Sequence, residues 1–221
     1  MKKPKIILVI AASLDSRIAL SSGDGSHIGT EIDRKLLEKS ISQVDATIFG
    51  SGTLKAHQNT YLLKEKDIFG KNKRISDQQP ISIVVGNSSK FSENWNYFKQ
   101  PIIRWLITSN KNTQNSKITF DRIFLFKKSW ANTLKSLKRE GVNKIALLGG
   151  SQLIYSFAKE DLIDEIKITI CPKIIGGEFS WIPFKEKNDI SKFENRWKIN
   201  MIKVLKTNEI FIHYTKKFNN Q

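Results

Sequence analysis

The sequence has few of the residues that form disulfides and metal sites. Its 221 residues include one cysteine, Cys171, and three histidines, His27, His57 and His213. A single cysteine excludes a disulfide within the chain and any cysteine-rich metal site. The three histidines match no spacing of metal ligands. We therefore expect no metal, and we expect Cys171, within the apolar stretch "ITICP", to be an inert thiol in the core.

Long hydrophobic runs are also missing. No apolar stretch approaches the roughly 20 residues that a membrane-spanning helix needs. The first residues, "MKKPKIILVIAASLDS", are similar to a signal sequence until Asp15 and Arg17 interrupt them. We interpret this stretch as a first strand, and we expect a cytoplasmic protein with no membrane partner.

Acidic residues are scarce relative to basic ones. The chain has 21 Asp and Glu against 37 Lys and Arg, which gives a formal net charge of +16. Such an excess is typical of proteins that bind nucleic acid, an anionic membrane or a phosphorylated small molecule. The basic residues are scattered, and the chain has no arginine-rich tract and no aromatic RNA-binding signature. A soluble basic surface is therefore favoured over a nucleic-acid partner.

What the chain does contain is a series of short, β-branched apolar runs, which predict buried strands. The predicted strands cover Ile6–Ala11, Ala46–Gly50, Ile81–Val85, Ile103–Thr108, Ile123–Phe126, Lys144–Leu148, Glu165–Cys171, Trp197–Leu205 and Glu209–Thr215. The last two alternate around "KTNE", which predicts a terminal antiparallel pair.

Helical patterns lie between several of these strands. Thr30 can cap a helix over residues 31–42, and a second helix is predicted over Ser129–Glu140, ended by Gly141. A third is predicted over Ser151–Lys159. Residues 54–80 and 86–101 are polar and irregular, which indicates loops. Strands that alternate with helices predict an α/β fold with a largely parallel sheet, here as one domain over residues 1–221.

Two adjacent glycines, Gly149 and Gly150, separate a predicted strand from a predicted helix. Ligands of open parallel sheets bind beyond the carboxyl ends of the strands. Glycines let a ligand approach the backbone, so the amides of Ser151, Gln152 and Leu153 could face a pyrophosphate at the start of the helix. A plain tight turn explains the glycines equally well, because the stretch matches no established phosphate-binding motif.

Three other strand ends support a ligand site. "IAASLDSRIA" (Ile10–Ala19), "ATIFGSGTLKA" (Ala46–Ala56) and "VVGNSS" (Val84–Ser89) each end a strand in small, glycyl or hydroxyl-bearing residues. Because such ends lie along the same edge of a parallel sheet, they predict one cleft for an extended, phosphorylated ligand.

Taken in order, the stretches "ASLDSRIAL", "HIGTEIDR", "DATIFGSGT", "LLGGSQL", "LIDEI" and "CPKIIGG" resemble one family. The family is the reductase domain of the bifunctional riboflavin-biosynthesis deaminase/reductase, which is similar in fold to dihydrofolate reductase. The resemblance extends from about Ile6 to the final strand. It implies a dihydrofolate reductase-like α/β fold, with a mostly parallel central sheet, antiparallel C-terminal strands and helices on both faces.

The resemblance also implies an activity. In that family NADPH donates a hydride to the ribosyl group of 5-amino-6-(5-phosphoribosylamino)uracil, so the implied partner is a phosphorylated small molecule. A homodimer is implied as well. The zinc ligands of the companion deaminase domain have no counterpart in this chain, so we expect a reductase domain without a deaminase domain.

The resemblance assigns cofactor contacts residue by residue. The positions that match NADPH-binding positions of the family are Ala11, Ala12, Thr53, Asn87, Ser88, Gly149, Gly150, Ser151, Gln152 and Leu153.

At the positions that match the family's substrate site, this chain departs from the family's residues more than at the cofactor positions. His27 stands where the family has tryptophan, and Lys64 stands near the family's arginine and could attract a phosphate as a point charge. Ile41 and Leu148 occupy positions where the family has an arginine and an acidic residue.

Two residues are candidates for catalysis. Asp15 could orient the substrate, although an aspartate after a strand more often caps its own turn, and that interpretation is slightly favoured. His57 could donate a proton near neutral pH, although a lone histidine in a loop is more often a bystander.

Two other functions remain open at the level of the sequence. One is a reductase of the same fold that acts on another pterin- or pyrimidine-like substrate. The other is a catalytically inactive relative that binds nucleotides or RNA, for which steeply salt-dependent binding is expected.

Overall fold

The structure is a computed structural model, which describes residues 3–20, 28–63, 79–87, 91–110, 120–183 and 196–217. These residues form two compact units. The first comprises Met1–Pro4 and Glu38–Ala146, and the second comprises Lys5–Leu37 and Leu147–Gln221. The expectation of a single domain stays a prediction.

The described residues contain nine strands, four α-helices and one 3-10 helix. The strands are β1 (Lys5–Ser13), β2 (Ala46–Gly50), β3 (Ile81–Val85), β4 (Arg104–Thr108), β5 (Arg122–Leu125), β6 (Lys144–Gly149), β7 (Glu165–Cys171), β8 (Trp197–Val204) and β9 (Ile210–Lys216). The helices are α1 (Glu31–Ile41), α2 (Ser51–His57), α4 (Trp130–Arg139) and α5 (Ser151–Lys159), and the 3-10 helix is η2 (Asn96–Lys99).

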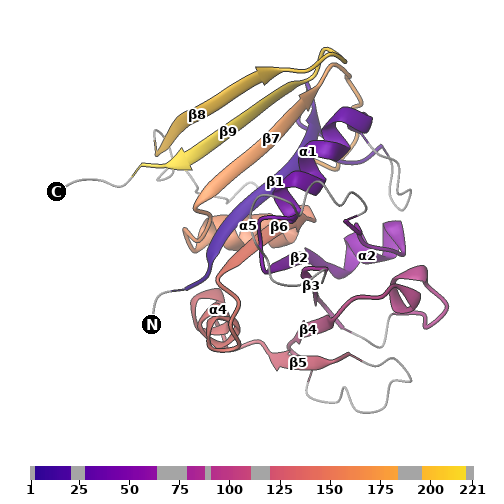
Figure 1. Cartoon of the computed structure of the whole chain (residues 1–221), viewed down its shortest axis with the longest axis vertical. Coiled ribbons are helices and arrows are strands. Elements are labelled where there is room, and N and C mark those ends of the chain that lie inside the picture. The colour runs from indigo at the N-terminus through magenta and orange to yellow at the C-terminus, as the bar shows by residue number, and fades with distance from the viewer. Residues whose placement is uncertain are drawn as a thin grey trace. The chain divides into compact units, whose positions relative to one another are not determined.

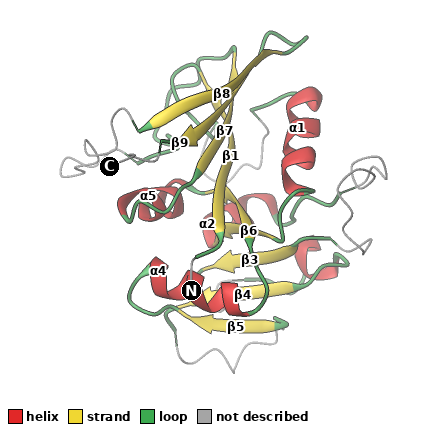
Figure 2. Cartoon of the chain, turned by 60° about the vertical axis from the view of Figure 1, so that its left-hand side comes forward, coloured by secondary structure: helices red, strands yellow, loops and turns green. Residues whose placement is uncertain are grey.

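The first unit contains a parallel arrangement of β2, β3, β4 and β5. Each strand pairs in parallel with the next, and Figure 2 shows β3, β4 and β5 side by side. Ile48, Ile83 and Leu106 are fully buried. Burial on both faces explains why β2, β3 and β4 are almost continuously apolar in the sequence, whereas β5 is mostly exposed.

Two helices of this unit differ in how well the sequence predicts them. Helix α4 follows Ser129, whose hydroxyl accepts a hydrogen bond from the Asn132 amide at 3.3 Å, as expected of an N-cap. Helix α2 contradicts the prediction of a loop from residue 54. It has only seven residues and contains Gly52, which favours helix poorly. The 3-10 helix η2 likewise lies within the second predicted loop.

The end of α2 is held by contacts with η2. Gln58, in the left-handed conformation, caps the helix through its amide, and its carbonyl accepts a hydrogen bond from the Tyr97 amide at 2.8 Å. The Tyr97 side chain is fully buried and donates to the Ser82 hydroxyl at 3.1 Å. Burial raises the pKa of Tyr97 to about 12, so the phenol stays a neutral donor.

The second unit combines parallel and antiparallel pairing. Strand β7 pairs in parallel with β1 on one side and antiparallel with β9 on the other, and β8 pairs antiparallel with β9. Figure 1 shows β7, β9 and β8 as neighbours. The predicted α/β class, the mostly parallel strands and the antiparallel C-terminal pair are therefore confirmed.

A buried carboxylate joins the β8–β9 turn to the start of α1. Glu209 is 0% exposed and accepts hydrogen bonds from the Thr30 amide at 2.8 Å and the Thr30 hydroxyl at 2.5 Å. The Thr207 hydroxyl donates at 2.8 Å, and the Cys171 thiol lies 3.5 Å away. These donors keep the pKa of Glu209 below its usual range despite burial. Burial and the nearby carboxylate raise the pKa of Cys171 to about 12, which supports the prediction of an inert thiol.

Candidate functional site

The paired glycines occupy the position that the sequence predicts, between the end of β6 and the start of α5. Gly149 is buried and has φ +130°, a conformation that side-chain-bearing residues rarely adopt, and its peptide bond to Gly150 is cis. Gly150 is half-buried and has φ −79° and ψ 178°, which any residue can adopt. The two glycines therefore differ: only Gly149 is required by the backbone.

The three residues after the glycines form the first turn of α5. Ser151 is half-buried and Gln152 is exposed. Leu153 is buried, and its amide donates to the Gly150 carbonyl at 2.9 Å. The prediction of a free Leu153 amide is therefore wrong, because the first turn of the helix already uses this donor.

The end of β1 belongs to the same unit. Ala11 is half-buried, whereas Ala12 is 0% exposed. Ala11 is therefore partly accessible to a ligand, whereas Ala12, backbone included, is enclosed by protein.

Asp15 is fully engaged in holding its own loop. One carboxylate oxygen accepts from the Ser13 hydroxyl at 2.6 Å and the Ile175 amide at 3.1 Å, and the other accepts from the Gly176 amide at 2.6 Å. These hydrogen bonds, with Ser13 first, hold the pKa of Asp15 well below its usual range. The geometry favours the turn role, because an acid this strongly stabilised as a carboxylate is a poor proton donor.

An Asp15→Asn substitution separates the two roles. An amide keeps one acceptor oxygen but cannot accept from all three donors, so we expect a lower melting temperature. General acid–base groups contribute at least ~100-fold to kcat, so a residue with only the turn role should cost less than about 10-fold. The measurement is kcat beside a thermal melt. A collapse of kcat with an unchanged melting temperature would instead make Asp15 catalytic.

The other predicted cofactor residues lie in the first unit, at the ends of β2 and β3. Gly50 pairs with Val85, so α2 starts beside the segment that follows β3. Thr53, in α2, is half-buried, and so is Asn87, two residues after β3. Hydroxyl and amide side chains at the carboxyl ends of neighbouring parallel strands are donors suited to an anionic ligand.

Gly86, directly after β3, lets the chain lie close to Ser51 at the start of α2. A Cβ atom there would lie 2.5 Å from the Ser51 Cβ and 2.7 Å from the Ser51 hydroxyl oxygen. We expect Gly86→Ala to lower the free energy of unfolding by about 1–3 kcal/mol, because either the loop or Ser51 has to move.

Gly52 provides the matched control in the same unit. No atom lies within 4 Å of the position that its Cβ would occupy. Gly52→Ala should leave the unfolding free energy unchanged or raise it by up to ~1 kcal/mol through helix propensity. Denaturant unfolding measures the stability of both variants. Equal destabilisation by Gly86→Ala and Gly52→Ala would show that the contact between residue 86 and Ser51 is unimportant.

Of the remaining predicted residues, His57 is the last residue of α2 and is half-buried, so its prediction as a loop residue is wrong. His27, Lys64 and Ser88 lie outside the described residues. The structure therefore groups Ala11, Ala12, Asp15 and Gly149–Leu153 in one unit and Thr53, His57 and Asn87 in the other.

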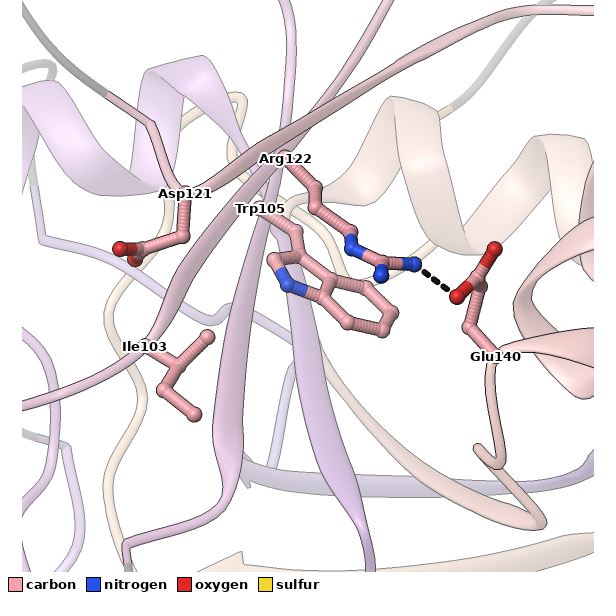
Figure 3. A pocket seen from close by; sticks show the side chains of 5 residues that line it. All are labelled: Ile103, Trp105, Asp121, Arg122 and Glu140. Atoms are coloured by element: carbon pink, nitrogen blue, oxygen red, sulfur yellow. Dashed lines mark hydrogen bonds and ion pairs between the residues drawn. The ribbon is translucent and has the colours of Figure 1, made fainter.

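A surface hollow of about 300 Å³ lies elsewhere in the first unit. It is lined by Ile103, Trp105, Asp121, Arg122 and Glu140. Figure 3 shows the Arg122 guanidinium lying along the Trp105 indole, 5.7 Å from a ring centroid, and reaching Glu140 in an ion pair. The hollow lies at the amino ends of β4 and β5, whereas ligands of parallel sheets bind at the carboxyl ends. We therefore do not assign it to the predicted cofactor site.

Two negative findings concern the described part of the chain. Its His, Cys, Asp and Glu side chains form no group of three or more that could hold a metal ion. Its helices are all too short or too polar to span a bilayer.

Comparison with known proteins identifies relatives over most of the sequence. The chain is 25% identical over 205 residues to the riboflavin biosynthesis protein RibD of Buchnera aphidicola subsp. Baizongia pistaciae, which covers 86% of this chain and 55% of that protein. It is also 25% identical over 186 residues to the 2,5-diamino-6-ribosylamino-4(3H)-pyrimidinone 5′-phosphate reductase of Archaeoglobus fulgidus, which covers 80% of this chain and 84% of that protein. The chain thus spans about half of the first relative and most of the second.

Solved structures share the fold. A pyrimidine reductase-like protein from Corynebacterium diphtheriae has a TM-score of 0.79 at 17% identity, covering 98% of this chain and 93% of that chain. A deaminase/reductase from Thermotoga maritima has a TM-score of 0.78 at 16% identity, covering 97% of this chain and 57% of that chain. The family model of the RibD C-terminal domain matches residues 4–208. The chain therefore belongs to the RibD C-terminal domain family.

Proposed function

We propose that this chain is an NADPH-dependent reductase of riboflavin biosynthesis that acts on 5-amino-6-(5-phosphoribosylamino)uracil. The observation that carries the proposal is the family match over residues 4–208. The relative from Archaeoglobus fulgidus, 84% of which is covered by this chain, is itself named a ribosylaminopyrimidinone phosphate reductase.

The proposed reaction needs little chemistry from side chains. When bound, NADPH supplies a hydride to the ribosyl carbon of a C=N or C=O group, and the displaced bond pair takes a proton on nitrogen or oxygen. The protein has to hold the reacting carbons together and exclude water. This agrees with the engagement of Asp15 in its own loop, which leaves the proton donor unassigned.

Each unit contains residues that suit one part of a dinucleotide. In the second unit, accessible Ala11 and half-buried Gly150 and Ser151 present small groups and backbone to a diphosphate. In the first unit, Thr53 and Asn87 supply neutral donors, and the open space beside Gly52 leaves room at the start of α2. We propose that Asn87, with Ser88, favours the 2′-phosphate of NADPH over NADH.

The proposal also covers the binding of the substrate phosphate and the oligomeric state. We assign the phosphate to Lys64 and a substrate contact to His27, on the basis of the resemblance alone. We also propose a homodimer without a nucleic-acid partner.

A second substrate is supported by a specific relative. The name of the Archaeoglobus fulgidus enzyme specifies the 2,5-diamino-pyrimidinone, which differs from the uracil in carrying an amino group that has not been removed. The two candidates therefore differ at one ring position, far from the ribosyl carbon that is reduced.

Steady-state NADPH oxidation with both pyrimidines tests the proposal. We expect turnover of at least one, with kcat/KM for the uracil at least about 10-fold higher, since one unmatched polar group in a binding site costs ~1.4 kcal/mol or more. A preference for the diamino compound would reassign the substrate. Failure of both compounds, together with steeply salt-dependent RNA binding, would favour the inactive nucleic-acid-binding relative.

A further inference from the structure

The segment after β7 lies beside the segment after β1, and both belong to the second unit. The stretch "CPKIIGG" begins with Cys171, the last residue of β7. In this stretch the Lys173 carbonyl accepts a hydrogen bond from the Leu14 amide at 2.8 Å. Further along, the Phe179 carbonyl accepts a hydrogen bond from the Ile18 amide, also at 2.8 Å. The chain that leaves β1 is therefore bonded through its backbone to the chain that leaves β7.

The Lys173 side chain bonds to a second point of the β1–α1 connection, of which residues 14–20 and 28–30 are described. Its ammonium donates a hydrogen bond to the Ile28 carbonyl at 2.9 Å. Ile28 is buried, and α1 starts three residues later, at Glu31. One residue thus links the start of the connection, at Leu14, to its end, at Ile28.

The start of α1 has an anchor of its own. Thr30 donates hydrogen bonds to the Glu209 carboxylate from both its amide and its hydroxyl. Glu209 comes from the turn before β9, whereas Lys173 follows β7. Because Glu209 keeps Thr30 in place, loss of the Lys173 ammonium should shift the backbone at Ile28 and leave α1 folded.

The β1–α1 connection borders the edge of the sheet where a ligand is expected. It leaves the carboxyl end of β1, which pairs in parallel with β7, and ligands of open parallel sheets bind beyond such ends. The NADPH contacts proposed for this unit lie at Ala11, Gly150 and Ser151. Lys173 forms a hydrogen bond with none of them in the described part of the chain. The ligand left for the connection is the substrate.

We propose that Lys173 is a positioning residue for the phosphorylated pyrimidine substrate, an inference that rests on the proposed reductase function. Its ammonium does not touch the substrate. It fixes the backbone at Ile28 relative to Leu14, and so sets the shape of the connection beside the substrate. A lysine suits this role, because its ammonium carries only donors and its charge strengthens the bond to a carbonyl.

Three variants test the proposal. Lys173→Met removes the ammonium and keeps an unbranched apolar side chain, whereas Lys173→Arg keeps a cationic donor. Lys206→Met is the control, because Lys206 is an exposed lysine of the same unit whose side chain pairs with no described residue. The measurements are kcat, KM for the pyrimidine and KM for NADPH, beside a thermal melt.

The expected result separates substrate binding from stability. In Lys173→Met, KM for the pyrimidine should rise at least ~10-fold, because a misplacement of about 1 Å can cost ~100-fold. Both kcat and KM for NADPH should stay within about 3-fold of the wild type, since a uniform loss of substrate binding raises KM alone. The melting temperature should fall by no more than about 4 °C, as expected for one hydrogen bond. Lys173→Arg should recover most of the loss, and Lys206→Met should behave like the wild type.

Two results would make Lys173 something other than a positioning residue. Equal losses in Lys173→Met and Lys206→Met would show that only the net charge matters. The dephosphorylated pyrimidine tests direct contact with the substrate phosphate: we expect the KM penalty of Lys173→Met to persist with this compound. A penalty that disappears would make Lys173 a phosphate ligand and contradict the proposal.

Hydrogen exchange provides a readout that needs no turnover. In Lys173→Met the amides of residues 28–30 should exchange faster than in the wild type, and those of α5 should not change. An active wild type, combined with neither the KM change nor the faster exchange in Lys173→Met, would overturn this inference alone. A wild type that turns over neither pyrimidine would overturn the proposed function and, with it, this role of Lys173.

Discussion

Gly149→Ala is expected to reduce NADPH affinity by about 10–100-fold and to lower the free energy of unfolding by ~1–3 kcal/mol. Gly149 has φ +130°, and a Cβ atom makes this conformation costly. The chain can relieve that cost only by moving the turn that leads into α5. Gly150 and Ser151, which we propose to contact the diphosphate, would then move with it. Tryptophan or NADPH fluorescence titration measures the affinity, and denaturant unfolding measures the stability.

Gly150→Ala is the matched control for this prediction. With φ −79° and ψ 178°, Gly150 accepts a side chain without strain, so its replacement should change the unfolding free energy by less than ~1 kcal/mol. If the diphosphate approaches this backbone closely, the added methyl group should still weaken NADPH binding. Unchanged NADPH affinity in both variants would refute the proposed position of the diphosphate.

Glu209→Ala should have the largest effect on stability. The carboxylate is fully buried and accepts hydrogen bonds from the Thr30 amide, the Thr30 hydroxyl and the Thr207 hydroxyl. Its removal leaves these donors without their acceptor, at about 1–3 kcal/mol for each buried group, so we expect a loss of about 3–5 kcal/mol. Urea unfolding at neutral pH measures it. A loss below ~1 kcal/mol would mean that water or other groups replace the carboxylate.

The pH dependence of stability gives an independent test of Glu209. Its pKa in the folded protein lies below its ordinary value of about 4.3, so ionised Glu209 stabilises the folded state. This contribution is complete above the unfolded pKa and is lost as the pH falls through the folded pKa. Glu209→Gln cannot ionise, so we expect its unfolding free energy to fall less than that of the wild type between about pH 5 and pH 3. Parallel curves for the two proteins would contradict this account.

Much of the fold is predictable because apolar residues mark its strands, as nearly continuous runs in β2 and β3 and as every second residue in β7. The predicted bounds of β2, β3 and β7 are the observed ones, and so are those of α5. These patterns stop where the strands stop, which is why the predicted bounds agree with the observed ones. Helix α2 gave no comparable signal, since it is a single short stretch with a glycine inside and one fully buried side chain, Leu54.

The sequence indicates the type of site that we propose, but not the detail of its backbone. Glycines and hydroxyls at strand ends predict a ligand site, but they do not show that only Gly149 has a backbone that requires glycine, or that the Leu153 amide already donates within its helix. Glu209 was missed because an acidic residue in a polar turn has the pattern of a solvated one. Its partner Thr30 lies 179 residues away in the chain, and only the fold brings the two together.

The central claim, hydride transfer from NADPH to the ribosyl carbon, is tested most directly by isotope transfer. The protein is incubated with the phosphoribosylaminopyrimidine and NADPH deuterated at the transferable position, and the product is examined by mass spectrometry. We predict a ribityl product that carries one deuterium on the former ribosyl carbon. A ribityl product without deuterium, when the cofactor deuterated on either face is used, or the absence of any reduced product, would contradict the account.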